Sequence, residues 1–139
     1  MVLQKFIDYC NDHAFQIPSS NKRGGHGLHE RIVESVERNP GCISSDPEDV
    51  WRGVVLRENN GRNISEMDVV ILDEIDGIYV VECKSTLGRR SKAYDQLIKA
   101  YEFLDSHFRI HPRLFLATPY ERTGVVFEEF LPKRDMEKT

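Results

Sequence analysis

Three charged side chains stand at the ends of two apolar runs in the stretch "MDVVILDEIDGIYVVECKS", residues 67 to 85. Asp68 opens the first run, and Glu82 and Lys84 close the second. Two neighbouring carboxylates repel each other, and a divalent cation, which prefers oxygen ligands, relieves that repulsion. Such a cation lowers the pKa of a water and neutralises charge on a phosphoryl group, and a lysine beside it orients the water or stabilises the charge. These residue types therefore suit hydrolysis of a phosphodiester.

Strand geometry predicts how the three groups would meet. Because alternate side chains of a strand point to opposite faces, Glu82 and Lys84 share a face and Cys83 packs on the other. The turn "DEIDG" folds the two runs into a hairpin that brings Asp68 opposite Glu82 to Lys84. A register slip of one residue would separate them. The alternative is an ordinary solvated strand face, which is what most Glu-x-Lys pairs are, with Asp68 capping a strand.

The rest of the chain predicts the elements that must position this hairpin. Apolar residues recur at helical spacing in three segments and form β-like runs in five, and Ile43 is expected to start a short edge strand. The predicted helices are residues 2–14, 28–38 and 92–108, and the predicted strands are 50–58, 67–72, 78–85, 113–118, which Pro119 ends, and 124–131. This order predicts an α/β domain with a mixed central β-sheet flanked by helices, in which the strand–helix–strand unit through residue 118 is parallel.

Length and composition limit the class of protein. The chain has 139 residues, which predicts one domain over residues 1–139 with a frayed tail over 132–139. Its net charge of −4 argues against a surface coated in positive charge, but a local basic groove is compatible with it. The three cysteines, Cys10, Cys42 and Cys83, are far apart, so we expect no disulfide framework and a reducing compartment, cytoplasmic or nuclear. No segment is apolar and long enough to span a membrane.

Two parts of the chain resemble a known group of enzymes. The segments "EMDVVI" and "IYVVECKS" resemble the PD-(D/E)XK nuclease superfamily, which has a restriction-endonuclease-like core. The segment "GLHERIVESVERNPGCI" is similar to the first helix of archaeal Holliday-junction resolvases, in which a helix glutamate approaches the metal site. Glu30 matches that glutamate, and it lies about 200° around the helix from Leu28. We therefore expect Glu30 to lie off the core stripe and to face a cleft.

The resemblance continues to about residue 118, starting from about residue 24. The segment "DQLIKAYEFL" is similar to the helix that carries a glutamine in many members, and Gln96 matches it. Tyr101 lies five residues after Gln96, one more than in the exonuclease-like branch. Met67 stands where the superfamily's proline would be, and Glu66 with Asp68 looks more like resolvases and nuclease-related domains.

The resemblance implies a role for each matching residue and a cofactor. Mg²⁺ or Mn²⁺ would be held by Asp68, Glu82 and the main-chain carbonyl of Cys83, with Glu30 as an accessory acid. Lys84 would assist the attacking water, and Gln96 would help to position the site. Many small members of this fold act as dimers, so the resemblance also implies a homodimer.

Two further groups of residues could join the site. His29 adjoins Glu30 and points about 100° away, so one of the two faces the site; we expect Glu30, although some cap-snatching endonucleases of this fold place a histidine on the metal. Basic side chains in two loops are expected to contact phosphates or to be solvated loop residues. These are Arg89, Arg90, Lys92, Lys22 and Arg23.

The resulting hypothesis is a divalent-metal-dependent nuclease, with DNA as the expected substrate and endonucleolytic cleavage as the expected mode. One alternative is a nucleic-acid- or protein-binding module that kept the fold without cutting. The other is an RNA-cutting endonuclease, because nothing in the sequence separates DNA from RNA.

Overall fold

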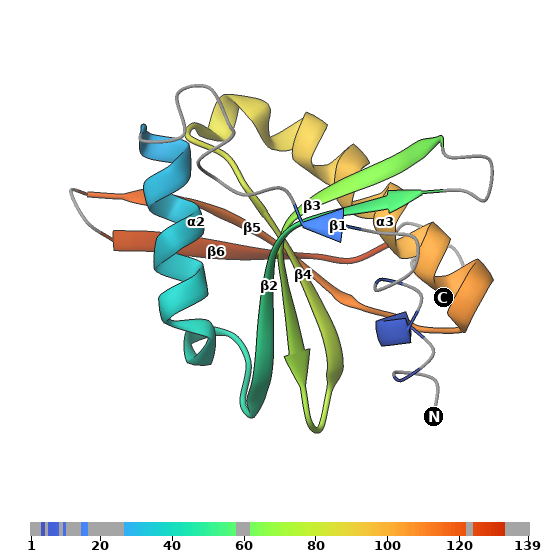
Figure 1. Ribbon diagram of the computed structural model, residues 1–139. Coiled ribbons are helices and arrows are strands. Elements are labelled where there is room, and N and C mark those ends of the chain that lie inside the picture. The colour runs from blue at the N-terminus through green and yellow to red at the C-terminus, as the bar shows by residue number, and fades with distance from the viewer. Residues whose placement is uncertain are drawn as a thin grey trace.

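A six-stranded sheet runs through the part of the chain that the computed structural model describes, residues 4, 6–8, 10, 15–16, 27–57, 62–121 and 124–132. Its strands lie side by side in sequence order (Figure 1). The elements are β1 (Phe15–Gln16), α2 (Leu28–Arg38), a 3₁₀ turn (Pro40–Cys42), β2 (Pro47–Arg57), β3 (Asn63–Asp73), β4 (Gly77–Cys83), a 3₁₀ turn (Leu87–Arg89), α3 (Arg90–Phe108), β5 (Arg113–Tyr120) and β6 (Gly124–Phe130). No helix in these ranges is long and apolar enough to cross a membrane.

The sheet is mixed, which confirms the predicted α/β class. Strands β1 to β4 pair antiparallel, β4 and β5 pair parallel, and β5 and β6 pair antiparallel. The parallel pair is the one joined through α3, as the sequence predicted, because a parallel connection needs a long crossover.

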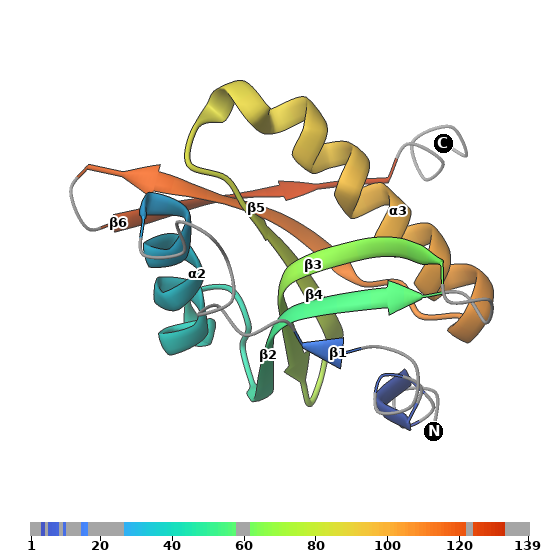
Figure 2. The ribbon, with the colours of Figure 1, turned by 45° about the horizontal axis from the view of Figure 1, so that its top comes forward.

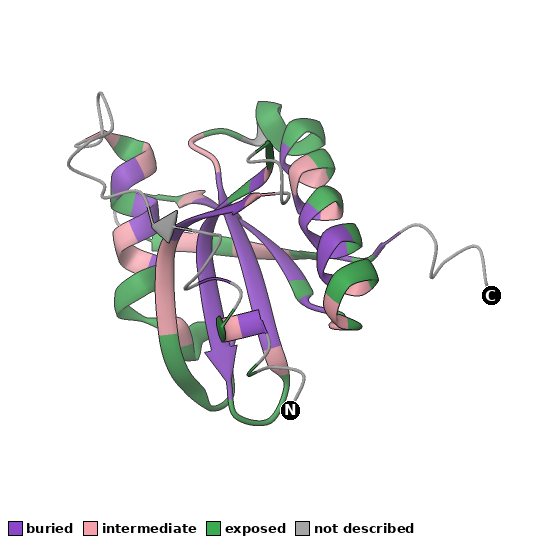
Figure 3. Cartoon of the chain, turned by 45° about the vertical axis from the view of Figure 1, so that its right-hand side comes forward, coloured by how far each residue is buried: buried purple, intermediate pink, exposed green. Residues whose placement is uncertain are grey.

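Helices cover both faces of the sheet. The amphipathic helix α2 packs Ile32, Val33 and Val36 on one face, and α3 covers the other face with the stripe that includes Leu97 and Leu104. Figure 2 shows the two helices on opposite sides, and Figure 3 shows that the central strands and the inner side of α3 are buried. The helical residue Phe6 belongs to the α3-side core, whereas most of the predicted first helix, 2–14, lies outside the described residues.

Strands β2 and β3 bend together in the middle, where strict alternation breaks. Met67 and Val70 both pack in the α3-side core, although an odd and an even position of a straight strand would face opposite sides. On β2, Gly53 adopts a φ of 64°, which only glycine reaches without steric cost. The register places Gly53 opposite Asp68 at this bend, which Figure 1 shows as a joint curve of both ribbons.

The turn between β3 and β4 is fixed by one buried carboxylate. Asp73 has no exposed surface. Its Oδ1 accepts the N–H groups of Ile75 and Asp76 at 2.7 and 2.8 Å, and its Oδ2 accepts the Ser44 hydroxyl and the Asp46 N–H. Burial alone would raise the pKa of Asp73, but these donors lower it well below the ordinary aspartate value.

Two sequence predictions about strand ends are wrong, for physical reasons. Ile43 follows a 3₁₀ turn and starts no strand. Pro119 lies inside β5, where it pairs with Val125 of β6. The Lys84 N–H donates to the Ala117 carbonyl, so the next bond of this parallel ladder would have to come from Pro119, which has no N–H. Pro119 therefore ends the pairing of β5 with β4 rather than β5 itself.

The loop and tail predictions have mixed outcomes. Residues 87–89 form a 3₁₀ turn and α3 begins at Arg90, two residues before the predicted start. The hairpin ends earlier than predicted, at Cys83, so Lys84 and Ser85 follow β4. Most of the tail predicted to be frayed, 133–139, lies outside the described residues.

Candidate catalytic site

The site is built around Asp68, which is 6% exposed at the bend of β3. The pairing of Val69 with Val81 places Asp68 opposite Glu82 in the antiparallel ladder. Oδ2 of Asp68 accepts the N–H of Cys83 at 2.8 Å, so the carboxylate reaches across to β4. The register that would separate the two acids is therefore not the one the chain adopts.

Glu82 and Lys84 complete the group on the β4 side. The Glu82 side chain is 4% exposed and Oε2 lies 3.4 Å from Nζ of Lys84, whose side chain is 12% exposed. Burial is the main cause that raises the pKa of Glu82 well above its ordinary value, the charge of Asp68 adds to it, and Lys84 opposes it. The three charged groups predicted to meet do so, and their low exposure differs from that of an ordinary solvated strand face.

His29, in the first turn of α2, also reaches this group. Its Nε2 lies 3.3 Å from Oδ2 of Asp68, and 39% of the side chain is exposed. His29 and Glu30 lie about 100° apart around the helix, and the resemblance favours Glu30 for this position. The structure places His29 there instead.

Glu30 is buried and bound to another partner. Oε2 accepts a hydrogen bond from Nη1 of Arg52 at 2.7 Å, and Nη2 of the same guanidinium donates to Glu37 at 2.8 Å. Glu30 is off the core stripe of α2, as expected, but its carboxylate holds α2 to β2 rather than facing an open cleft. A direct role of Glu30 at a metal stays a prediction.

The donor set fits a divalent cation in its chemistry. Within the described residues, no three His, Cys, Asp or Glu side chains form a metal-holding group. Oδ1 of Asp68 and Oε1 of Glu82 make no hydrogen bond to any described residue. Because the N–H and C=O of an extended residue point to the same neighbouring strand, the Cys83 carbonyl faces β3 as its N–H does. Two carboxylate oxygens and one carbonyl oxygen are the ligands that Mg²⁺ and Mn²⁺ accept.

Gln96 lies on α3, and no hydrogen bond joins it to Asp68, Glu82 or Lys84. It lines a hollow with Glu66 of β3, and its Oε1 is buried with no hydrogen-bond partner in the described residues. The Cys83 side chain is fully buried in the α2-side core, as the alternation predicted for it.

The expected phosphate-binding residues differ in their surroundings. Arg89 and Lys92 are exposed at the start of α3. Arg90 forms an ion pair with Glu128 and lies 5.0 Å from the ring centre of Phe130, so β6 already engages it. Lys22 and Arg23 lie outside the described residues.

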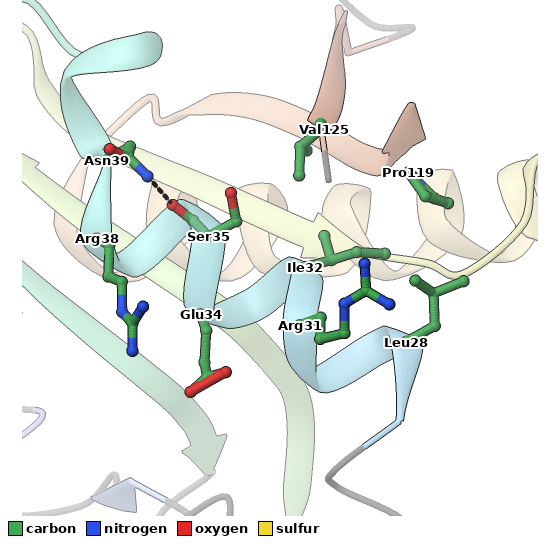
Figure 4. Close-up of a pocket in the computed structure, with 10 residues that line it drawn as sticks. Leu28, Arg31, Ile32, Glu34, Ser35, Arg38, Asn39, Pro119 and Val125 are labelled. Atoms are coloured by element: carbon green, nitrogen blue, oxygen red, sulfur yellow. Dashed lines mark hydrogen bonds between the residues drawn. The ribbon is translucent and has the colours of Figure 1, made fainter. Parts of the chain in front are cut away.

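A second hollow, of about 280 Å³, lies between α2 and the ends of β5 and β6. Figure 4 shows Pro119 and Val125 across from α2, with the Asn39 side chain bonded to the Ser35 carbonyl. None of Asp68, Glu82 and Lys84 lines it. The candidate site and this hollow are therefore separate features of the fold.

No protein-family model matches the chain, and no curated protein matches it.

Proposed function

We propose that the chain is a divalent-metal-dependent nuclease that hydrolyses phosphodiester bonds, with DNA as the first candidate substrate. The observation that carries this proposal is the pair of buried acids, Asp68 and Glu82, which face each other across a ladder, with the half-buried Lys84 3.4 Å from the second acid. Buried like charges are costly unless a ligand uses them, so the arrangement favours function over structure alone.

The chain's own residues would divide the work. Asp68 and Glu82, with the Cys83 carbonyl, would hold Mg²⁺ or Mn²⁺. When bound, the cation supplies charge neutralisation at the phosphoryl oxygens and a lowered pKa for a coordinated water. Lys84 is placed to hold the attacking water by hydrogen bonding and to stabilise the negative charge that develops. His29 orients Asp68 from α2.

Both helices present their positive ends near the carboxyl end of β4. Residue His29 in the first turn of α2 touches Asp68, and α3 begins shortly after Lys84. Neither helix has a side-chain cap at its N-terminus, so backbone N–H groups there remain available to an anion. Together with the exposed Arg89 and Lys92, these ends favour a phosphate backbone as the ligand.

The resemblance to PD-(D/E)XK nucleases supports the same function. The sequence of elements α2, β2, β3, β4, α3 and β5 gives the mixed sheet with flanking helices that this resemblance implies. Asp68 lies on β3 and Glu82 on the neighbouring β4, with Lys84 directly after that strand, as the quoted motifs require. The restriction-endonuclease-like core is part of the proposal.

A second candidate is a binding module that does not cut. It is favoured by one observation, that no three acidic, histidine or cysteine side chains of the described ranges form a metal-holding group. On this reading the chain would bind nucleic acid or protein without Mn²⁺-dependent hydrolysis.

A cleavage panel with Mn²⁺ separates the candidates. The substrates are single-stranded and duplex DNA, flaps, four-way junctions and RNA, incubated with the wild-type chain and with Asp68→Asn, Glu82→Gln and Lys84→Met. We expect each substitution to lower the cleavage rate by at least about 100-fold, which is typical for loss of a positioned charged group. The matched control is Glu74→Gln, which removes one exposed negative charge in the β3–β4 turn.

The outcomes are distinct. Full cleavage by all three variants would refute the nuclease site at Asp68, Glu82 and Lys84. Absence of cleavage by the wild-type chain, together with no heat of Mn²⁺ binding in calorimetry, would favour the binding module. Preference for RNA over every DNA form would make the chain an RNA-cutting endonuclease.

A further inference from the structure

A polar hollow lies between α3 and the first half of β3, close to the candidate catalytic site. Its volume is about 250 Å³, and its polar lining comes from Asn63, Ser65, Glu66, Gln96 and Lys99. One water occupies roughly 30 Å³ in the liquid, so the hollow admits a group much larger than a single water.

Gln96 gives this hollow an unmet hydrogen-bonding demand. Its Oε1 is buried without a partner, and its side chain makes no hydrogen bond to any residue that the structure describes. Buried acceptors are nearly always paired in folded proteins, and each exception calls for a donor from a ligand or a water. The amide offers one acceptor and two donors on a flat group.

The position of the hollow ties it to the substrate path. Glu66 precedes Asp68 by two residues on β3, so the hollow lies beside the bend that carries the candidate site. Lys92, Gln96 and Lys99 follow one another at helical spacing on α3, and both lysines are exposed. A nucleic-acid strand that leaves the site along α3 would meet the two lysine charges, with the Gln96 amide between them.

We propose that this hollow is a subsite for one unstacked nucleobase of the substrate strand, read by the Gln96 amide, while Lys99 contacts a neighbouring phosphate. The subsite rests on the proposed function in one respect, that the ligand is a nucleic acid. Every base has a hydrogen-bond donor next to an acceptor on its Watson–Crick edge. A glutamine amide can pair with both of these groups through two hydrogen bonds. A base reaches such a hollow only when it is unpaired, so the strand beside the cut is single or opened.

Binding measurements test the subsite without any cleavage. The probes are fluorescent single-stranded oligonucleotides in deoxy and ribo form, with an abasic residue moved one position at a time, and Ca²⁺ replaces Mg²⁺. For the wild-type chain we expect one position at which removing the base weakens binding by roughly 5- to 100-fold. In Gln96→Met, which keeps the volume and loses the hydrogen bonds, the same abasic change should weaken binding less than about twofold.

Two other variants complete the design. Gln4→Met makes the same chemical change at an exposed glutamine in the N-terminal helical residues and should behave as the wild type. Lys99→Met should weaken binding of intact and abasic oligonucleotides alike, because it removes a phosphate contact that carries no base information.

Several results would overturn the inference. These are equal binding at every abasic position, the same position dependence in Gln96→Met as in the wild type, or no measurable binding of any oligonucleotide. Cleavage that proceeds without base dependence would leave the nuclease proposal standing and remove the subsite. Base-dependent binding without cleavage would support the subsite and contradict the nuclease proposal.

Discussion

Nε2 of His29 lies 3.3 Å from Oδ2 of Asp68, although the two residues are 39 positions apart. The same Oδ2 also accepts the N–H of Cys83. One carboxylate oxygen thus joins α2, β3 and β4, and the position of α2 becomes part of the candidate site.

His29→Ala should lower the cleavage rate by about 10- to 100-fold, because groups that orient a metal-holding carboxylate typically contribute that much. The fold should persist, since His29 is partly exposed. The control is His111→Ala, which removes an exposed histidine that pairs with Asp105 instead. Cleavage rates with Mn²⁺ and circular dichroism spectra of both variants test this prediction. An unchanged rate in His29→Ala would mean that the contact with Asp68 serves packing alone.

Glu82→Gln should change how stability depends on pH and on Mn²⁺. Because the pKa of Glu82 is raised in the folded chain, the folded state holds the proton more tightly, and wild-type stability should fall as pH rises above the ordinary glutamate pKa. The glutamine variant lacks this fall. A hundredfold excess of Mn²⁺ over its Kd should stabilise the wild type by roughly 2.7 kcal/mol and the variant far less. Thermal melts with EDTA or Mn²⁺ measure both effects, and equal Mn²⁺ stabilisation would contradict a role for Glu82 in holding the cation.

Asp73→Asn should lower the free energy of unfolding by about 1–3 kcal/mol near neutral pH, because buried donors lose a charged acceptor. The pKa of Asp73 is depressed in the fold, so its contribution is complete above the ordinary aspartate pKa and is lost as pH falls below about 4. The gap between the two proteins should therefore shrink in acid. Urea titrations at several pH values check this, with Asp95→Asn on the exposed side of α3 as control. A gap that stays constant down to about pH 2 would speak against it.

Gly53→Ala should destabilise the chain by about 1–2 kcal/mol, because an L side chain at a φ of 64° is strained. Because Gly53 lies opposite Asp68, this strain should displace Asp68 and lower the cleavage rate as well. Gly41→Ala is the control, because a Cβ there meets nothing within 4 Å. Chemical denaturation and cleavage rates are compared, and equal effects of the two substitutions would mean that the bend does not depend on glycine.

Glu30→Gln and Arg52→Met should act on one interaction. If Glu30 serves by holding α2 to β2, the double variant costs less stability than the sum of the single ones, with a coupling of about 0.5–3 kcal/mol. Mn²⁺ affinity should then change little in either variant. If Glu30 holds the cation as the resemblance implies, only Glu30→Gln should weaken Mn²⁺ binding in calorimetry.

The hairpin was predictable because its information is local. Alternation along "IYVVECKS" puts Glu82 and Lys84 on one face, and the turn centred on residue 75 sets Asp68 opposite Glu82. The joint bend was missed, since it depends on Gly53 in a different strand and on packing that draws Met67 and Val70 into one core.

The helical period alone does not determine whether His29 or Glu30 contacts Asp68. Periodicity fixes the angle between the two side chains, but the rotation of α2 against the sheet follows from how Ile32 and Val36 pack. Arg52 decides it further, because it binds Glu30 from a strand 22 residues away. Long-range ion pairs of this kind leave no pattern in a single sequence.

The length of the β3–β4 turn determines which residues of the two strands face each other. Asp73 pairs with Gly77 at the turn, and the same count of residues along each strand, five, leads to Asp68 on one side and Glu82 on the other. Asp73 bonds that turn to Ser44 and Asp46, so the position from which the pairing of the two strands begins is fixed. A chain with one residue more in the turn could keep every strand and both helices and still set Asp68 beside the wrong neighbour. The length of this distant turn thus determines the geometry of the candidate site as directly as the identity of the two acids does.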